Sequence, residues 1–278
     1  MKKPLVSCIC VTQNRRFFLR KAIAYFQRAA DRFEQATNER AELVIVDGSK
    51  QSNAYLVEED NDYITGSLPH SPVRYIWHPS PDHAKVGWFH NQACEASTGD
   101  FIIQWDDDDW HSASRILKQC DVLRASAVPA FTFTSKFYLY HLPDKVASLA
   151  RTWHVGKNSG SVGAMFAYHR ATWEKVPFQD VPQGEDNFFW SDCQAKGIPF
   201  LDSEDPSFCM YVRHHQNGSP LTHAVPDLRV TSLARAKLAE ENDLAFYDEV
   251  TELLPLASWD RLRPMHGRNW ERLARRAR

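Results

Sequence analysis

The sequence lacks any run of apolar residues long enough to cross a membrane, since no stretch approaches 18 such residues. It also lacks internal repeats and low-complexity segments, so no linker marks a domain boundary. Basic and acidic side chains nearly balance, and the formal net charge of −2 gives no argument for nucleic acid as the main partner. We therefore expect one large domain, or two closely packed ones, within the 278 residues.

The cysteines show no C-x-x-C pair and no spacing typical of a zinc site. Cys8 and Cys10 lie in an apolar run, where alternate residues share one face of a strand. Buried thiols are the simplest interpretation, and they favour a reducing compartment. The six positions are Cys8, Cys10, Cys94, Cys120, Cys193 and Cys209.

The amino-terminal segment superficially resembles a signal peptide, because two lysines precede the apolar residues from Leu5 to Val11. That apolar run is short, however, and the polar residues 13–16 stand where a small-residue cleavage site is expected. We therefore expect a cytoplasmic protein.

Four consecutive aspartates, Asp106 to Asp109, directly follow the apolar run 101–105, which is typical of a buried strand. Adjacent carboxylates repel one another and are costly to leave unpaired at a buried strand end. A hard divalent cation such as Mg²⁺ or Mn²⁺ removes this cost and leaves positions for phosphate oxygens. The alternative is a solvated acidic turn before a helix. The apolar strand and the tryptophans on both sides favour the metal site.

Apolar segments at 4–12, 43–46, 73–77 and 101–105 indicate strands, and helical spacing predicts helices near 18–29 and 87–96. This alternation is typical of a parallel α/β sheet. Ligands of such sheets bind at the carboxyl ends of the strands, so we expect the residues following these strands to line one cleft. Lys85 precedes the second helix, where it either helps to bind an anion or is simply solvated.

Beyond Arg115 the pattern changes. A helix near 116–123 precedes aromatic alternating segments, 131–134 and 137–140, which are typical of antiparallel strands in a mixed second half. The segment 156–163 lacks the spacing of a phosphate-binding loop and is expected to be an ordinary loop. Glu185 and Asp186 open an aromatic helix, where acidic residues also suit the helix dipole.

The chain from Asp227 onward is helical in character. Its last part, Arg261–Arg278, holds seven arginines and one glutamate, so it carries about +6 while the rest carries about −8. A solvated basic terminus is one interpretation. A peripheral contact with a membrane surface or another anionic partner is the alternative.

These features together resemble a family 2 glycosyltransferase of the GT-A fold, over roughly residues 4–223. The segment Val6–Arg15 is similar to the family's first strand and its Tyr-Asn-Arg turn, with Gln13 in the tyrosine position. Val44–Ser49 resembles Val-Asp-Asp-Gly-Ser with one aspartate missing. His90-Asn91 stands where the family usually has Arg-Asn. Three further matches are the Asp-x-Asp-Asp metal motif at 106–109, the Glu-Asp motif at 185–186 and Tyr-x-Arg-His at 211–214.

The resemblance implies an α/β GT-A fold, a Mn²⁺ or Mg²⁺ cofactor and inverting transfer of a sugar from a nucleotide-sugar, most often UDP-linked, to a hydroxyl acceptor. It implies metal ligation by Asp108, Asp106 and His214, with His215 the less favoured neighbour. Asp186 is expected to be the base and Glu185 to bind hydroxyl groups, although the two roles could be exchanged. The nucleotide-sugar contacts implied are Thr12, Asn14, Arg15, Asp47, Lys85, Asn91, Asp106 and Asp107.

We expect residues 1–110 to form the nucleotide-sugar-binding half, 111–225 the acceptor-binding half and 226–278 a helical extension. A nucleotidyltransferase is the first alternative, but it normally has a glycine-rich signature after its first strand, where this chain reads Thr12–Arg16. A non-catalytic nucleotide-sugar-binding protein is the second alternative. Simple calcium binding at Asp106–Asp109 is the least favoured alternative, because the EF-hand spacing with its glycine and final glutamate is missing. The sequence does not specify the acceptor or the oligomeric state.

Overall fold

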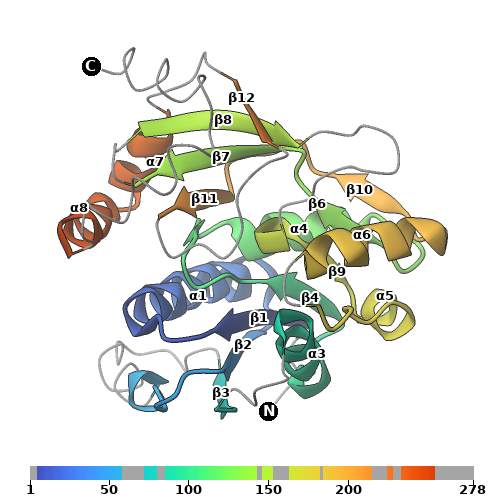
Figure 1. Ribbon diagram of the computed structural model, residues 1–278. Coiled ribbons are helices and arrows are strands. Elements are labelled where there is room, and N and C mark those ends of the chain that lie inside the picture. Colours follow the sequence, from blue (N-terminus) through green and yellow to red (C-terminus); the bar gives the residue numbers. More distant parts are fainter. Residues whose placement is uncertain are drawn as a thin grey trace. The chain divides into compact units, whose positions relative to one another are not determined.

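The computed structural model describes residues 5–57, 72–79, 85–142, 146–152, 163–181, 184–214, 224–227 and 233–253. The chain divides into two compact units (Figure 1). Unit 1 contains residues 1–134 and 161–203, and unit 2 contains residues 135–160 and 204–278. Among the described helices, none combines the length and the apolar character needed to cross a bilayer.

Unit 1 is built on a seven-stranded mixed sheet with the order β10-β6-β9-β4-β1-β2-β3. Strands β4, β1, β2 and β3 are parallel, whereas β9 runs antiparallel between β4 and β6. The predicted mixed α/β sheet is therefore confirmed. The bounds are β1 Val6–Thr12, β2 Ala41–Asp47, β3 Val73–Trp77, β4 Phe101–Gln104, β6 Phe131–Phe133, β9 Ala167–His169 and β10 Phe200–Asp202.

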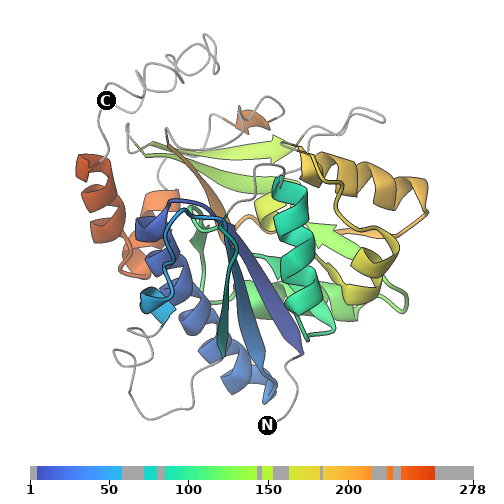
Figure 2. The same ribbon diagram turned by 60° about the horizontal axis from the view of Figure 1, so that its bottom comes forward.

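Helices cover both faces of this sheet. Helix α1 (Arg16–Thr37) connects β1 to β2, and α3 (Val86–Ala96) connects β3 to β4 in the opposite direction along the sheet. Right-handed crossovers then place α1 and α3 on opposite faces (Figure 2). Helix α4 (Arg115–Arg124) lies beside α1. The remaining elements of unit 1 are β5 Trp110–His111, the 3₁₀ helix η1 Gly163–Met165, α5 Arg170–Lys175 and α6 Glu185–Ala195.

The strand register brings the predicted polar residues to one sheet edge. Thr12 pairs with Asp47 at the ends of β1 and β2, and Ile9 pairs with Gln104 at the end of β4. The backbone N–H of Trp105 then donates to the carbonyl of Ile9, so the chain enters the aspartate run beside β1. Trp105 itself is fully buried and its indole N–H donates to the carbonyl of Ala22 in α1. The shared edge predicted from the sequence is confirmed.

Unit 2 contains strands in the order β12-β8-β7-β11, with β7 and β11 parallel and the other pairs antiparallel. Helix α7 lies against β8, and the rings of Tyr140 and Tyr247 meet edge to face at 5.9 Å. Helices α7 and α8 confirm the predicted helical character within residues 233–253, and the rest of the predicted helical tail lies outside the described residues. The bounds are β7 Lys136–His141, β8 Val146–Thr152, β11 Cys209–Arg213, β12 Ala224–Asp227, α7 Leu233–Glu240 and α8 Leu244–Leu253.

The aromatic segments after Arg115 form strands, as predicted, but these strands belong to two different sheets, each with parallel and antiparallel neighbours. Strand β6 has antiparallel β9 on one side and parallel β10 on the other, whereas β7 has antiparallel β8 and parallel β11. The expectation of antiparallel strands is thus half correct, because alternation predicts a strand without choosing its neighbours. The loop predicted at 156–162, His215 and the basic segment Arg261–Arg278 lie outside the described residues.

Candidate functional site

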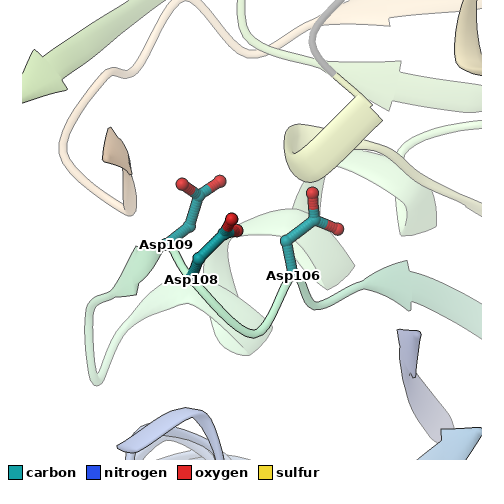
Figure 3. Close-up of side chains that lie close together, drawn as sticks. All are labelled: Asp106, Asp108 and Asp109. Carbon is teal, nitrogen blue, oxygen red and sulfur yellow. The ribbon is translucent and has the colours of Figure 1, made fainter. Parts of the chain in front are cut away.

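The aspartate run forms a turn between β4 and β5. Asp106, Asp108 and Asp109 each offer one carboxylate oxygen, and these oxygens lie within 4.8 Å of one another. Figure 3 shows the three carboxylates on the same side of the turn. A compact set of carboxylate oxygens in a largely buried position suits a hard divalent cation. The predicted ligands Asp106 and Asp108 are thus brought together, and Asp109 joins them. The sequence signal for Asp109 was the fourth carboxylate of the run.

A positive charge would stabilise the ionised form of this turn, because its carboxylates are buried and repel one another. Burial, and then the charges of Asp108 and Asp107, raise the pKa of Asp106 above its usual range. Burial also raises the pKa of Asp107, against the opposing effect of Arg15. A bound cation would reverse this effect because it favours the ionised carboxylates. The donor set therefore fits the predicted Mn²⁺ or Mg²⁺.

Asp107 points elsewhere and joins the turn to the end of β1. Its Oδ2 accepts a 2.6 Å hydrogen bond from the Thr12 hydroxyl, and its Oδ1 pairs with Arg15 at 2.9 Å. Arg15 also pairs with Asp108, and its side chain is 24% exposed. The nearby carboxylates raise the pKa of Arg15 despite its burial. Thr12 and Arg15, both predicted to contact the nucleotide-sugar, thus hold the aspartate turn in place.

Asp47 organises the loop that follows β2. It is fully buried, and Oδ1 accepts the backbone N–H of Ser49 at 2.8 Å. Oδ2 accepts from the Asn53 amide at 2.8 Å and from the Tyr75 hydroxyl at 2.6 Å. Burial and this bond to Asp47 raise the pKa of Tyr75 to about 12. Sequence reasoning missed Asn53 and Tyr75, because neither belongs to a recognisable motif.

The turn after β1 is joined to the same loop. Asn14 has a left-handed backbone (φ 55°), its N–H donates to the Ser49 hydroxyl at 2.6 Å, and its side chain accepts from the N–H of Lys50 at 3.4 Å. The indole N–H of Trp77 donates to the Ser49 carbonyl at 2.9 Å while 42% of that residue stays exposed. Trp77, the last residue of β3, therefore packs against the loop after β2 and presents an exposed aromatic surface at the carboxyl edge of the sheet.

The acidic pair opens α6 after Gly184, whose backbone is left-handed (φ 80°). Asp186 Oδ2 accepts the backbone N–H of Gly163 at 3.1 Å. A Cβ atom on Gly163 would lie 2.8 Å from the Asp186 Cβ and 3.1 Å from Gln104 Oε1. Asp186 therefore lies close to the end of β4, immediately before the aspartate turn. Gly163 was expected only as part of a loop, so its contact with Asp186 was not predicted.

Glu185 faces helix α3. Its Oε1 lies 3.7 Å from Nδ1 of His90, which is buried and packs its ring on Phe178 with centroids 5.0 Å apart. Burial lowers the pKa of His90 to about 4. Burial, and then the charge of Asp186, raise the pKa of Glu185 to about 7. The two side chains are thus both uncharged over most of the range between these values.

The remaining predicted residues are Asn91, Lys85 and His214. The Asn91 side chain donates to the Phe178 carbonyl at 2.8 Å and accepts from the Trp173 indole and the Phe178 N–H, both at 2.9 Å. Asn91 therefore fixes the segment after α5 and has little hydrogen-bonding capacity left for a nucleotide. Lys85 is exposed at the N-cap of α3. His214 is fully buried after β11 in unit 2.

A buried arginine supports the aspartate turn from below. Arg115 is fully buried and donates to the carbonyls of Gln104 and Ala164, both at 2.6 Å, and to Gln119 Oε1 at 3.0 Å. It also donates to Nδ1 of His111, whose Nε2–H then donates to the Asp106 carbonyl at 2.8 Å. These contacts fix the chain on both sides of Asp106. Their only sequence signal is the presence of His111 and Arg115 soon after the aspartates.

Comparison with known proteins places this geometry in a family context. Residues 7–138 match the family model described as Glycosyl transferase family 2. This match confirms the resemblance deduced from the sequence, and it runs from β1 through β6 to the start of β7, including the aspartate turn. No curated protein sequence matches the chain significantly.

Solved structures share the fold. Staphylococcus aureus TarS 1-349, solved with UDP-GlcNAc, has 16% sequence identity and a TM-score of 0.52, and the alignment covers 77% of this chain but 59% of TarS 1-349. A Pyrobaculum calidifontis mannosyltransferase, solved with GDP-Man and Mn²⁺, has 14% identity and a TM-score of 0.55, with 96% of this chain and 69% of that one aligned. The chain therefore spans less than two thirds of TarS 1-349. At these identities the likeness shows the GT-A fold alone.

Proposed function

Because residues 7–138 match the family 2 glycosyltransferase model, we propose that this chain transfers a sugar from a nucleotide-sugar to a hydroxyl acceptor, with inversion at the anomeric carbon. A UDP-sugar is the first donor to test, since UDP-GlcNAc is bound in one structural neighbour; GDP-Man, bound in another, is the second. The acceptor is a hydroxyl group of a glycan, a lipid-linked sugar or a peptide.

The observation that carries this proposal is the convergence of two acidic clusters in unit 1. The Gly163 contacts bring Asp186 to the end of β4, and the chain leaving β4 holds the oxygens of Asp106, Asp108 and Asp109. Displacement at a sugar carbon needs charge stabilisation at the leaving group and a base for the attacking hydroxyl. The compact cluster of Asp106, Asp108 and Asp109 would meet the first requirement by holding a cation, and the acidic pair at the start of α6 would meet the second.

Asp106, Asp108 and Asp109 would hold Mn²⁺ or Mg²⁺, with His214 as the predicted further ligand. When bound, this ion stabilises negative charge on the departing diphosphate. Arg15, already beside Asp108, is placed to contribute a second positive charge. The proposed binding site for the nucleotide-sugar is completed by five further residues, most of which shape the loops after β1 and β2. They are Thr12, Asn14, Asp47, Asp107 and Lys85.

Asp186 is the proposed base, and Glu185 the proposed contact to acceptor or sugar hydroxyl groups. The N–H of Gly163 donates a hydrogen bond to one oxygen of Asp186 and so holds the carboxylate in one orientation. The carboxylate of Asp186 would then take the proton of the attacking hydroxyl as the new bond to the anomeric carbon forms. The division into a donor half (1–110), an acceptor half (111–225) and a helical extension (226–278) belongs to this proposal. So do the cytoplasmic location and the anionic contact through Arg261–Arg278.

The test is thermal stabilisation by UDP-, GDP- and dTDP-sugars, with and without Mn²⁺. A ligand at about 100 times its Kd contributes roughly 2.7 kcal/mol, which is easily measured. We expect one nucleotide class to stabilise the protein only with metal, and the effect to disappear in Asp108→Ala. Asp121→Ala, on the exposed side of α4, is the matched control.

Absence of stabilisation by every donor would overturn the proposed donor site. Metal-dependent binding of nucleoside triphosphates with sugar phosphates would instead support a nucleotidyltransferase. Donor binding without turnover in the wild type would support a non-catalytic binding protein. Unchanged turnover in Asp186→Asn would overturn Asp186 as the proposed base.

A further inference from the structure

The proposed function gives Glu185 a role but does not account for its contact with His90. His90 lies on the second turn of α3, and Glu185 is the first residue of α6. The His90 side chain is 9% exposed and the Glu185 side chain 15%, so both are largely removed from water. Nδ1 of His90 has no hydrogen-bond partner, although it is fully buried. An unsatisfied buried nitrogen facing a carboxyl group at 3.7 Å requires an explanation.

The surroundings of Glu185 oppose its ionisation. Asp186 is the adjacent negative charge on the same helix, and it is held in place by the N–H of Gly163. On the α3 side the facing titratable group is His90, and behind its ring lies the apolar Phe178. Among the described residues, neither lysine nor arginine forms an ion pair with Glu185. Two neighbouring carboxylates without a cation do not both ionise readily in a buried position.

We propose that Glu185 is held as a neutral carboxylic acid by donating its proton in a hydrogen bond to Nδ1 of His90, which makes His90 a positioning residue for the acceptor side of the site. A small rotation of the Glu185 side chain shortens the 3.7 Å separation to about 3 Å, the usual hydrogen-bond length. The arrangement satisfies the unpartnered nitrogen and leaves Asp186 as the single anion at the start of α6. The opposite shifts in the pKa values of the two groups agree with this assignment.

This inference rests on the proposed function for its consequence. A neutral Glu185 can both donate to and accept from a sugar hydroxyl, whereas an anion can only accept. It also separates the roles of the two acidic residues, because a protonated Glu185 cannot serve as the base. His90 therefore favours Asp186 as the base, a choice that the sequence left open.

The experiment is a pH titration by NMR of protein with ¹³C-labelled glutamate carboxyl groups, with Glu185 assigned by its loss in Glu185→Gln. In the wild type we expect the Glu185 signal to titrate near pH 7. His90→Phe removes the acceptor and should lower that midpoint by about one unit, a tenfold change in the protonation equilibrium. His90→Asn, which places an amide oxygen near the position of Nδ1, should restore the wild-type midpoint. His90→Arg should lower the midpoint most, because it adds a cation.

Titration of wild-type Glu185 near its ordinary value, or an equal midpoint in wild type and folded His90→Phe, would overturn the proposal. Should His90→Phe fail to fold, His90→Leu, which is smaller and also lacks an acceptor, takes its place in the comparison with wild type and His90→Asn. The titration needs neither donor nor turnover, so its outcome is independent of whether the chain proves to be a glycosyltransferase.

Discussion

The hydroxyl of Thr12 donates a 2.6 Å hydrogen bond to the carboxylate of Asp107, joining the last residue of β1 to the centre of the aspartate turn. Both residues are buried, so the contact is shielded from water. Thr12→Val keeps the side-chain shape but leaves Asp107 with one partner fewer. We expect a loss of roughly 1.5–3 kcal/mol in the free energy of unfolding, as for bonds to charged groups.

Urea unfolding of Thr12→Val measures this loss, and Thr12→Ser is its control because the hydroxyl remains. Equal stability of the two variants would show that the contact contributes little.

Gly163→Ala should impair turnover more than donor binding. The new Cβ would meet the Asp186 Cβ at 2.8 Å and displace the proposed base. We expect kcat to fall by about 10- to 100-fold, and by at least about 100-fold in Asp186→Asn, which removes the base. Steady-state kinetics with donor-binding titrations separate the two effects. The double variant should be no slower than Asp186→Asn alone, and a multiplicative loss would contradict this pathway.

Arg15→Met should strengthen metal binding in the absence of nucleotide. Arg15 pairs with Asp108, one of the three residues whose oxygens form the compact cluster. Removing this competing cation leaves more negative charge for Mn²⁺, and we expect about tenfold tighter binding by calorimetric titration. Arg16→Met, on the neighbouring exposed residue, is the control. Weaker Mn²⁺ binding in Arg15→Met would show that Arg15 organises the turn more than it competes with the ion.

The pH dependence of stability should expose the opposed titrations of His90 and Glu185. The pKa of Glu185 is raised from 4.5 to about 7, so the folded state holds an extra proton and its stability falls as pH rises through that window. The pKa of His90 is lowered from 6.5 to about 4, so stability rises with pH through that window. Between pH 4.5 and 6.5 the two slopes oppose each other.

Glu185→Gln removes one of these slopes. Between pH 4.5 and 6.5 the variant's unfolding free energy should rise with pH, relative to wild type, by up to about 1.4 kcal/mol per pH unit. Urea unfolding at several pH values measures the slope, and Glu174→Gln on exposed α5 is the control. A slope equal to that of wild type would contradict the raised pKa of Glu185.

Arg115→Met should be the most destabilising of these substitutions. It removes the donor shared by the carbonyls of Gln104 and Ala164, leaving two buried acceptors unsatisfied. We expect a loss of about 3–6 kcal/mol, because two hydrogen bonds from a charged donor, each contributing roughly 1.5–3 kcal/mol, are removed. Arg115→Lys should recover part of it, since one ammonium group can reach one carbonyl. Thermal unfolding provides the comparison.

The sequence predicted the parts of the site that depend on local pattern. An apolar strand followed by carboxylates places Asp106 and Asp108 at a sheet edge wherever the rest of the chain goes, and the acidic start of α6 is likewise local. Asn91 shows the limit of such reasoning. Its position in a family-like segment suggested a nucleotide contact, whereas in the structure three of the four hydrogen bonds that its amide can make hold residues 173–178.

Arg115, Gly163 and Tyr75 could not be predicted because their roles arise from contacts between distant segments. The residues that flank Gly163 in the sequence do not indicate that its missing side chain leaves room for Asp186. The identity of Asp109 as a third member of the cluster depended on the conformation of the turn, which four identical residues leave undetermined. Side-chain chemistry was therefore readable from the sequence, while its geometry was not.

The strand order of unit 1 also determines how much of its sheet can form while the chain is being synthesised. Strand β9, which separates β4 from β6, comes from a later part of the chain than both of its neighbours. A nascent chain that has reached residue 134 holds β4 and β6 before β9 and β10 are synthesised, so one edge of β4 and both edges of β6 lack their partner strands. The aspartate turn follows β4, so the Arg115 contact with the Ala164 carbonyl can form only after residues 163–169 have been synthesised. Chains that are truncated or whose translation stalls before β9 should therefore aggregate readily and depend on chaperones for solubility.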